Sequence, residues 1–352
     1  MANLLDIRRR IRSVVNTRQI TKAMKMVSAA RLRRAQERAL SARPYAKMLA
    51  SVLKSLVSRA EVYDPETGEP RHPLLARREG KSIFLIVVTG ERGLAGAFNT
   101  NILKAAQRFL DSKAGKHIEI ETIGRKGRDF FGRRFKMKPK PKPGEEAERA
   151  VAEAGTWIAG EMVGMLGKIE FDHARELAEE VIERYARGEI DSVFVVFNEF
   201  KSVIAQRLVV EEILPIGEIG ARGTRQAEEM ADEHRERAAE AAATAGVALA
   251  PADTTEIDRR AAQFGTAQVD YIYEQAADEL FRALLPKYVA IQIFRALLES
   301  VAAEHAARMT AMDSATNNAS DMIDSLTLAM NRARQAKITK EIIEIVSGAA
   351  AL

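Results

Sequence analysis

The 352-residue chain contains no cysteine, which excludes disulfides, thiolate metal sites and thiol-based redox switching. Aromatic residues make up 6% of the chain and none precedes Tyr45, so the N-terminal region offers no platform for stacking nucleic-acid bases. No apolar run approaches the roughly 18 residues that a membrane-spanning helix needs, so no such helix is expected. What remains is a chain whose 47% hydrophobic content suffices for a sizeable core.

Acidic residues are scarce at the N-terminal end. Residues 1–50 contain 13 Lys or Arg against only Asp6 and Glu37, a local charge of +11. Because the whole chain carries +5, the remainder carries −6. This asymmetry predicts that the N-terminal end meets an acidic partner, and the lack of aromatics argues against nucleic acid as that partner.

Residues 1–60 are predicted to form one long helix. Leu4, Ile7, Ile11 and Val14 are spaced three or four apart, which is the spacing of one helical face. Pro44 is expected to bend this helix. The apolar stripe is thin and its flanks are basic.

The C-terminal zone, residues 270–352, contains no proline after Pro286 and one glycine, Gly348. An unbroken helix is predicted over 287–347, roughly 90 Å long at about 1.5 Å per residue. Apolar residues recur in steps of three and four, a coiled-coil seam interrupted by His305 and Thr316. The seam comprises Phe294, Leu298, Val301, His305, Met309, Met312, Thr316, Ala319, Ile323, Leu326, Met330 and Ala333. The two terminal helices are therefore expected to wind together as a long antiparallel coiled coil.

In the central region, residues 78–215, the spacing of apolar residues changes from that of a helix to that of strands. Three short runs read as strands: "KSIFLIVVTG" (81–90), "HIEIETIG" (117–124) and "DSVFVVFNEF" (191–200). A helical pattern precedes the third. Alternation of strands with helices predicts an open, Rossmann-like α/β sheet domain projecting from the coiled coil.

Residues 217–268 are a charged, alanine-rich insertion. Large apolar residues are sparse there, as in "HRERAAEAAATAG". We expect a solvated or flexible segment outside the core, which is dispensable for assembly and costs little stability when deleted.

The sequence predicts no catalytic, cofactor or metal site. In "TGERGLAGAFN" (89–99), Gly90, Gly93 and Gly96 lack the spacing of a dinucleotide loop, and no G-K-[ST] follows. A tight strand-to-helix turn is the favoured interpretation. The five histidines include no pair at i, i+4 suited to a metal, and no catalytic nucleophile or carboxylate pair stands out.

The two ends of the chain carry specific motifs. These are "NTRQITKAMKMVSAARLRRAQ" (16–36) and "ARQAKITKEIIEIVSGAAAL" (333–352), with "RGLAGAFN" and "RALLESVAAEHAARMTAMDSATNNA" between them. They closely resemble the gamma subunit of F-type ATP synthases. The C-terminal signature of that family reads here as Ile338, Thr339, Glu341, Glu344, Gly348 and Ala349. The resemblance covers about residues 1–215 and 270–352, and the insertion 217–268 is expected to be longer than in most relatives.

The resemblance implies a rotor shaft without catalysis or cofactor of its own. Its coiled coil would stand inside a ring of alpha and beta subunits, and its base would bind the epsilon subunit and the membrane c-ring. Ion flow would turn the shaft, which would drive the catalytic beta subunits in turn. The chain would be present once per complex, peripheral to the bacterial cell membrane on its cytoplasmic side.

The resemblance also implies contact residues. The expected contacts with the catalytic ring are Met24, Lys25, Arg31, Arg33, Arg34, Arg334, Gln335 and Thr339. The expected contacts with the c-ring and epsilon are Tyr271, Tyr273 and Glu274. Two alternatives remain open: an enzyme that binds nucleotide in its α/β domain, and a coiled-coil scaffold on which no ATPase depends. Co-purification with ATPase subunits would separate the three.

Overall fold

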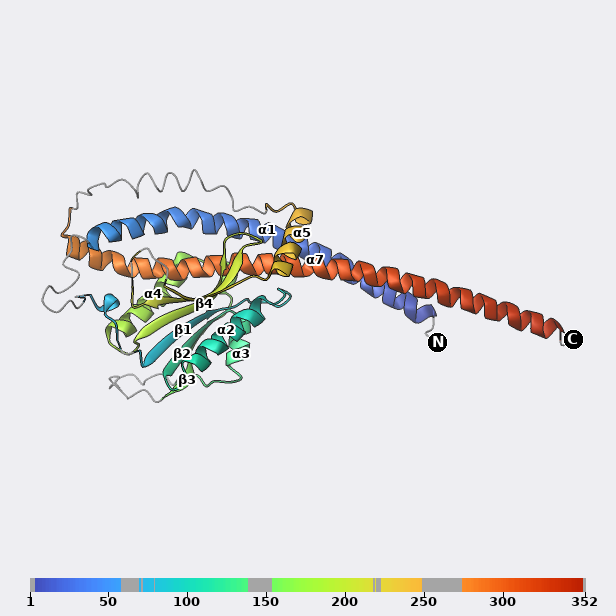
Figure 1. Ribbon diagram of the computed structural model, residues 1–352, viewed down its shortest axis with the longest axis horizontal. Helices are drawn as coiled ribbons and strands as arrows, with labels where there is room; N and C mark the ends of the chain where they lie inside the picture. Colours follow the sequence, from blue (N-terminus) through green and yellow to red (C-terminus); the bar gives the residue numbers. More distant parts are fainter. Residues whose placement is uncertain are drawn as a thin grey trace.

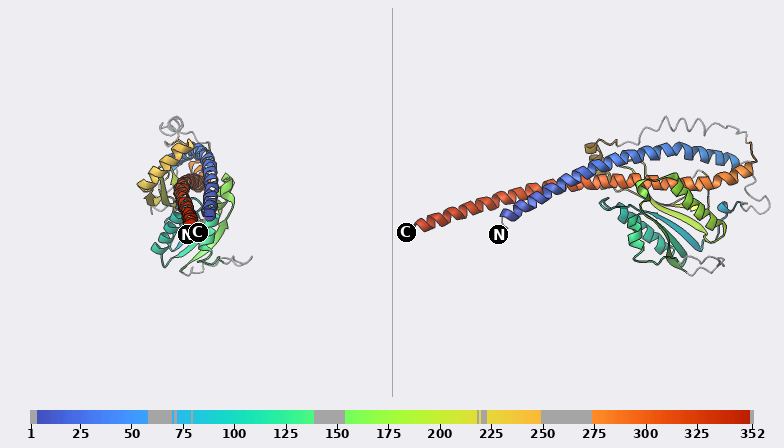
Figure 2. Two further views of the ribbon diagram at one scale, coloured as in Figure 1. Left: turned by 90° about the vertical axis from the view of Figure 1, so that its right-hand side faces the viewer. Right: turned by 180° about the vertical axis from the view of Figure 1, so that it is seen from behind.

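Two long helices from the chain ends form the axis of the molecule (Figure 1). The computed structural model describes residues 4–57, 70, 72–78, 80–138, 154–217, 219, 223–248 and 274–350. Helix α1 spans Leu4–Val57 and α7 spans Ala277–Ala350. They run antiparallel and cross, and the end of α7 projects beyond the start of α1 in Figure 1 and in the view from behind in Figure 2. With the sheet domain beside them, this confirms the predicted fold class.

Helix α7 begins earlier than predicted. It starts at Ala277 and contains Pro286, whereas the sequence pattern placed the start after that proline. An internal proline costs a helix about 3 kcal/mol because it removes a hydrogen bond and crowds the preceding turn. Phe281 and Leu285 on either side of that turn are almost completely buried, and this burial offsets the cost.

Four parallel strands form one side of a six-stranded sheet of order β3-β2-β1-β4-β5-β6. Strands β1 (Ser82–Val88), β2 (His117–Ile123) and β4 (Ser192–Phe200) are the three that the sequence predicted. Strand β3 (Gly155–Met162) was not predicted, because it lies at the edge, is only partly buried and contains glycines that weaken the strand pattern.

Two antiparallel strands complete the sheet. Strand β5 (Gln206–Leu214) pairs with β4, and β6 (Thr224–Glu229) pairs with β5 as the other edge. Neither was predicted. Every residue of β6 is exposed or only partly buried, so its sequence shows no alternation between a buried and a solvated face.

Helices cover both faces of the sheet. On one face lie α2 (Phe98–Ser112) and α3 (Arg125–Phe131), and on the other lies α4 (Phe171–Ala186), with short 3-10 turns at Pro73–Leu75 and Met165–Gly167. Alternate residues of β1 therefore enter two different hydrophobic cores, to both of which α1 and α7 contribute. Phe84, Ile86 and Val88 pack in the core with α4, and Ile83, Leu85 and Val87 in the core with α2.

The insertion contributes to the core, contrary to expectation. Helix α5 (Asp232–Ala245) follows β6 and lies across the coiled coil (Figure 1). Its buried side chains are Ala238, Ala241, Ala242 and Ala245, which belong to the same core as α2. The prediction that the segment 217–268 stays outside the core is therefore wrong for α5, because small alanine side chains allow a helix to pack closely without large apolar residues.

Candidate functional site

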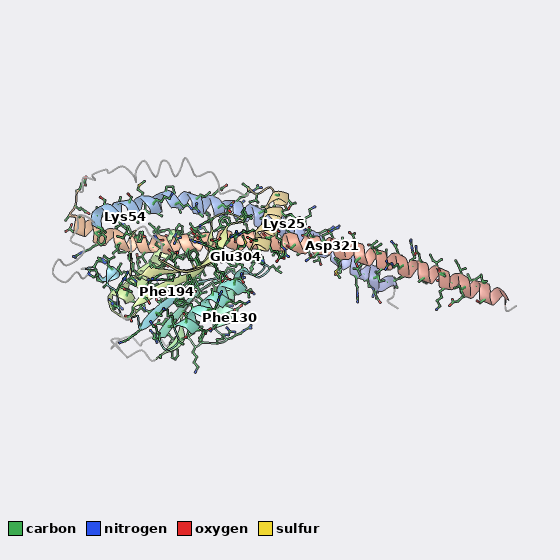
Figure 3. All side chains as sticks on the ribbon, in the orientation of Figure 1. Lys25, Lys54, Phe130, Phe194, Glu304 and Asp321 are labelled. Carbon is green, nitrogen blue, oxygen red and sulfur yellow. The ribbon has the colours of Figure 1, made fainter. Side chains whose placement is uncertain are left out.

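A buried ion pair fixes α1, α5 and α7 against one another. The Lys25 Nζ atom lies 2.5 Å from Asp313 Oδ1 and 2.6 Å from the Thr244 hydroxyl (Figure 3 labels Lys25 where the helices meet). The Lys25 side chain is only 9% exposed. A buried ammonium group needs such partners, because an unpaired charge in the interior is costly. Lys25, predicted to contact a surrounding ring, is instead paired within the chain.

The predicted seam of α7 faces α1. Met309, Met312 and Ala319 are buried, and farther along α7 Leu326 and Met330 are half-buried. The polar seam residue Thr316 has its hydroxyl 2.8 Å from that of Thr21, so the interruption is satisfied across the two helices. Burial decreases toward the C-terminal end, and the contact there is narrow.

Beyond this contact, α7 continues as a single helix. Since Lys25 lies opposite Asp313 and the helices are antiparallel, Leu4 at the start of α1 lies opposite about residue 334. Every described side chain from there to residue 347 is exposed. We call residues 334–347 the bare end. Three predicted contact residues, Arg334, Gln335 and Thr339, lie on it and are exposed.

The bare end carries uncovered apolar side chains. Ile338, Ile342, Ile343, Ile345 and Val346 are between 48% and 71% exposed. The ion pairs Lys337–Glu341 and Lys340–Glu344, at 3.6 and 3.5 Å, support the helix along its length. These residues form an exposed apolar surface of the kind that is found at protein interaction sites.

A basic cleft lies between the coiled coil and the carboxyl ends of the parallel strands. Its volume is about 750 Å³, and its arginines are Arg31, Arg34, Arg38, Arg92, Arg125 and Arg308. Arg308 is anchored, since its Nη2 donates to Glu304 Oε1 at 2.6 Å and to the carbonyl oxygen of Gly93 at 3.2 Å. Burial, together with Arg308 and Arg31, lowers the pKa of His305 to about 4, so this imidazole is neutral at pH 7. The cleft therefore presents a positive surface on which the predicted residues Arg31 and Arg34 meet.

The other predicted residues of α1 lie elsewhere. Arg33 donates from Nη2 to the carbonyl oxygen of Gly246 at 2.5 Å, where a cation is favoured at the C-terminal end of α5. Met24 is half-buried beside Lys25. Arg33 and Lys25 thus hold α5 on the coiled coil, a role that the sequence did not reveal.

The loop after β1 is a structural turn. The Asn99 side chain accepts a hydrogen bond from the Gly90 N–H at 2.8 Å, and a Cβ on Gly90 would come within 3.0 Å of Glu304. The Glu91 carboxylate accepts from the backbone N–H groups of Arg125 and Gly164, at 3.3 and 2.6 Å. The chain's own side chains thus hold this loop and tie it to the starts of neighbouring segments, as expected of a strand-to-helix turn.

Tyr271 and Tyr273, the predicted contacts with the c-ring, lie outside the described residues, and Glu274 is exposed. Within the described ranges no three His, Asp or Glu side chains are placed to hold a metal ion. None of the helices described is long and apolar enough to cross a bilayer.

Comparisons with known proteins agree on one family. The family model described as "ATP synthase" matches residues 3–352. The ATP synthase gamma chain of Solibacter usitatus is 47% identical over 351 residues, covering 100% of this chain and 99% of that one. The gamma chain of Pelotomaculum thermopropionicum is 43% identical, with 100% of both chains covered. A chain of the Euglena gracilis mitochondrial ATP synthase (OSCP/F1/c-ring) has the same fold, with a TM-score of 0.54, 16% identity, and 99% of this chain and 94% of that one covered.

These matches correct the expected extent of the resemblance. They include residues 217–268, and the two relatives align over essentially their whole lengths, so the insertion is not an addition relative to them.

Proposed function

The chain belongs to the ATP synthase gamma-chain family, and on that premise we propose how its structure performs the work of the central rotor shaft. The function is to couple ion flow through the membrane c-ring to ATP synthesis or hydrolysis at the beta subunits by rotation. The observation that carries the proposal is a contrast between the two ends of the coiled coil. Beside the sheet domain, α1 and α7 pack together and are joined by a buried ion pair, whereas at the far end α7 is a single exposed helix.

The bare end is the part that enters the catalytic ring. Its apolar side chains give it a surface that a sleeve of partner residues covers, while Arg334, Gln335 and Thr339 supply polar contacts to one subunit at a time. Because a single helix on one side of the axis is asymmetric, its rotation presents a different face to each beta subunit in turn. This is the means by which one shaft imposes different states on identical subunits.

The basic cleft and its rim supply contacts that form and release. Arg31 and Arg34 are exposed, so their attraction to acidic surfaces of the ring is screened by salt and weakly directional. Such contacts suit a turning interface, because they guide without holding one angle. Lys25 and Arg33 act within the chain and keep α5 seated on the shaft.

The remaining assignments follow the family. The chain is a subunit of the ATP synthase complex and is not itself catalytic, with nucleotide bound by the surrounding subunits. Tyr271, Tyr273 and Glu274 form its contact with the c-ring and epsilon. One copy stands in each complex, peripheral to the bacterial cell membrane on the cytoplasmic side.

The test is direct observation of rotation. Because the chain has no cysteine, Lys104→Cys on the exposed face of α2 provides a unique thiol for a bead. We expect the labelled chain to co-purify with alpha and beta subunits, and the bead to turn when ATP is added. The isolated chain should neither bind nucleotide tightly nor hydrolyse it. A stationary bead on a ring that hydrolyses ATP, or turnover by the isolated chain, would overturn the proposal.

A further inference from the structure

At the amino ends of β1 and β4, on the edge of the sheet opposite the basic cleft, lies a second concentration of positive charge. A cavity of about 190 Å³ is lined there by five basic side chains, Arg77, Arg78, Lys113, Lys116 and Arg225. Among the described residues, two acidic side chains, Asp191 and Glu212, line it with them. The basic residues come from three separate segments: the one before β1, the turn after α2, and β6.

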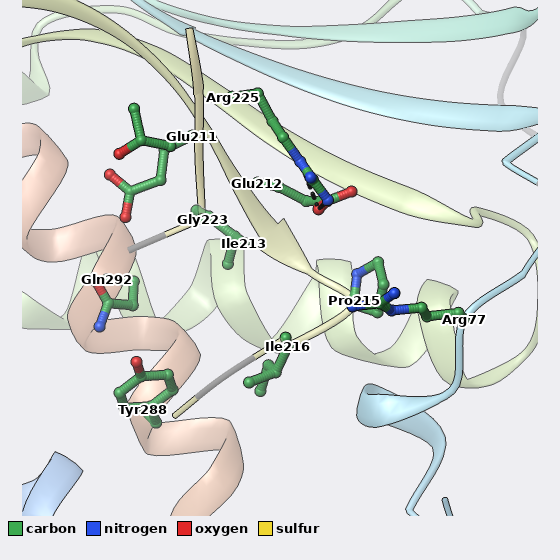
Figure 4. A pocket seen from close by; sticks show the side chains of 12 residues that line it. Arg77, Glu211, Glu212, Ile213, Pro215, Ile216, Gly223, Arg225, Tyr288 and Gln292 are labelled. Atoms are coloured by element: carbon green, nitrogen blue, oxygen red, sulfur yellow. Dashed lines mark hydrogen bonds and ion pairs between the residues drawn. The ribbon is translucent and has the colours of Figure 1, made fainter. Parts of the chain in front are cut away.

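Both carboxylates in this cavity are already engaged. Asp191 Oδ2 accepts hydrogen bonds from the backbone N–H groups of Lys81 and Ser82, at 2.8 and 3.0 Å. Glu212 Oε2 accepts from Arg225 Nε at 3.0 Å, an ion pair visible in Figure 4. Among the described residues, no carboxylate pairs with Arg77, Lys113 or Lys116. The described side chains that line the cavity therefore carry an excess of positive charge.

Part of the basic set is held in place. Arg78 Nη1 donates to the carbonyl oxygens of Tyr185 and Ile190, at 2.5 and 3.2 Å, and its guanidinium lies 4.6 Å from the centre of the Tyr185 ring. The Lys116 ammonium lies over Gly80, where a Cβ would be 3.6 Å from Nζ. Gly80 has φ +66°, which glycine adopts without strain, so the backbone leaves this space open for the lysine.

Helix capping explains only some of these residues. Lys113 and Lys116 follow the C-terminal end of α2, where the helix dipole favours cations. That effect does not account for Arg77 or for Arg225, which reach the same cavity from other segments. Arg77 and Arg225 also line an adjoining cavity of about 240 Å³, in which Figure 4 shows Arg77 beside Pro215.

We propose that this cavity binds a phosphate group. A small cavity with surplus guanidinium and ammonium groups suits a compact dianion, which these donors bind through charge-assisted hydrogen bonds. An acidic peptide would need a longer groove, and a metal ion would be repelled. The phosphate comes from inorganic phosphate, from pyrophosphate or from the headgroup of an anionic lipid, and the experiment distinguishes these sources.

The experiment uses the full chain at low, fixed salt. Inorganic phosphate and pyrophosphate are titrated by calorimetry, and vesicles of phosphatidylglycerol or phosphatidylcholine are tested by co-sedimentation. The variants are Lys113→Gln/Lys116→Gln and Arg77→Gln, and the matched control is Lys104→Gln, which removes an exposed lysine elsewhere on α2. A thermal unfolding transition is measured for each variant to show that it is folded. If the double variant is not folded, Arg77→Gln alone is used for the test.

We expect one saturable site for at least one probe. Its affinity should fall about tenfold or more in each variant, remain unchanged in the control, and decrease with added salt. Binding to phosphatidylglycerol vesicles without binding of free phosphate would assign the site to a lipid headgroup. No saturable binding of any probe, or equal losses in the control and the variants, would overturn the proposal.

Discussion

Glu121 provides the sharpest test of the packing inside the sheet domain. It lies on β2 and is only 6% exposed. A Cβ on Gly160 of the neighbouring strand would clash with its Oε2 atom, so the carboxyl group occupies the space that this glycine leaves. Burial, followed by repulsion from Glu180 and Glu161, raises the pKa of Glu121 from 4.5 to about 8.

The direction of the pH effect follows from proton linkage. Below about pH 4.5 both the folded and the unfolded chain carry the proton on Glu121, so this residue adds no pH dependence. Between about 4.5 and 8 the unfolded chain releases the proton while the folded chain keeps it, so stability falls as pH rises. At about 1.4 kcal/mol per pKa unit the full loss between 4.5 and 8 is roughly 5 kcal/mol, reached above pH 8.

Glu121→Gln should remove this dependence, because the amide is neutral at every pH. Urea unfolding of the isolated chain at pH 5, 7 and 9 measures it. We expect the variant to gain stability relative to the original chain as pH rises, with the largest gain at pH 9. Glu176→Gln on the exposed face of α4 is the control and should show no such trend. An equal difference between Glu121→Gln and the original chain at pH 5 and pH 9 would refute the reasoning.

Three further predictions concern the shaft. Leu326→Asp places a charge in the half-buried seam and should lower the unfolding free energy by about 2–3 kcal/mol. Arg334→Ala should leave the unfolding free energy unchanged but reduce coupled ATP synthesis in vesicles. Equal destabilisation by the two variants would contradict the division between seam and bare end. Asp313→Ala leaves Lys25 charged and buried and should cost about 3–5 kcal/mol in urea unfolding, unlike Asp321→Ala at an exposed position; equal costs would show that the pair is not stabilising. Deletion of 217–268 should lower the unfolding temperature of the free chain, contrary to the sequence-based expectation of little cost, because α5 is part of the core; an unchanged temperature would contradict this.

The sequence predicted the long elements well because their signals are repetitive. A seam that recurs every three or four residues over many turns averages out exceptions such as Thr316. Strands β1 and β4 were equally clear, since apolar, often branched residues dominate them, and β2 was marked by Ile118 and Ile120 alternating with charged residues. Strand β6 lacks that signal, because an exposed edge strand is held by backbone pairing with β5, which side-chain type does not encode.

The sequence did not reveal that Lys25 is buried, for a physical reason. A lysine is normally exposed, and its burial depends on partners that are distant in sequence. Asp313 is 288 residues from Lys25, and Thr244 is 219 residues away in a segment that looked solvated. Asp313 directly follows the seam residue Met312, and this acid at the edge of an apolar seam is the one local sign that a basic partner lies opposite.

Helix α1 begins at Leu4, and this position determines where the coiled coil gives way to a single helix that can twist. Up to that point two helices resist torsion together, because their side chains interlock and Lys25 pins Asp313 across the pair. Beyond it, α7 resists torsion through its own backbone hydrogen bonds and the i,i+4 ion pairs along the same helix. Angular lag between the sheet domain and the tip therefore accumulates in the single helix. Helix α7 thus runs from a torsionally stiff two-helix segment into a more compliant single-helix segment, and the length of α1 sets where the two meet.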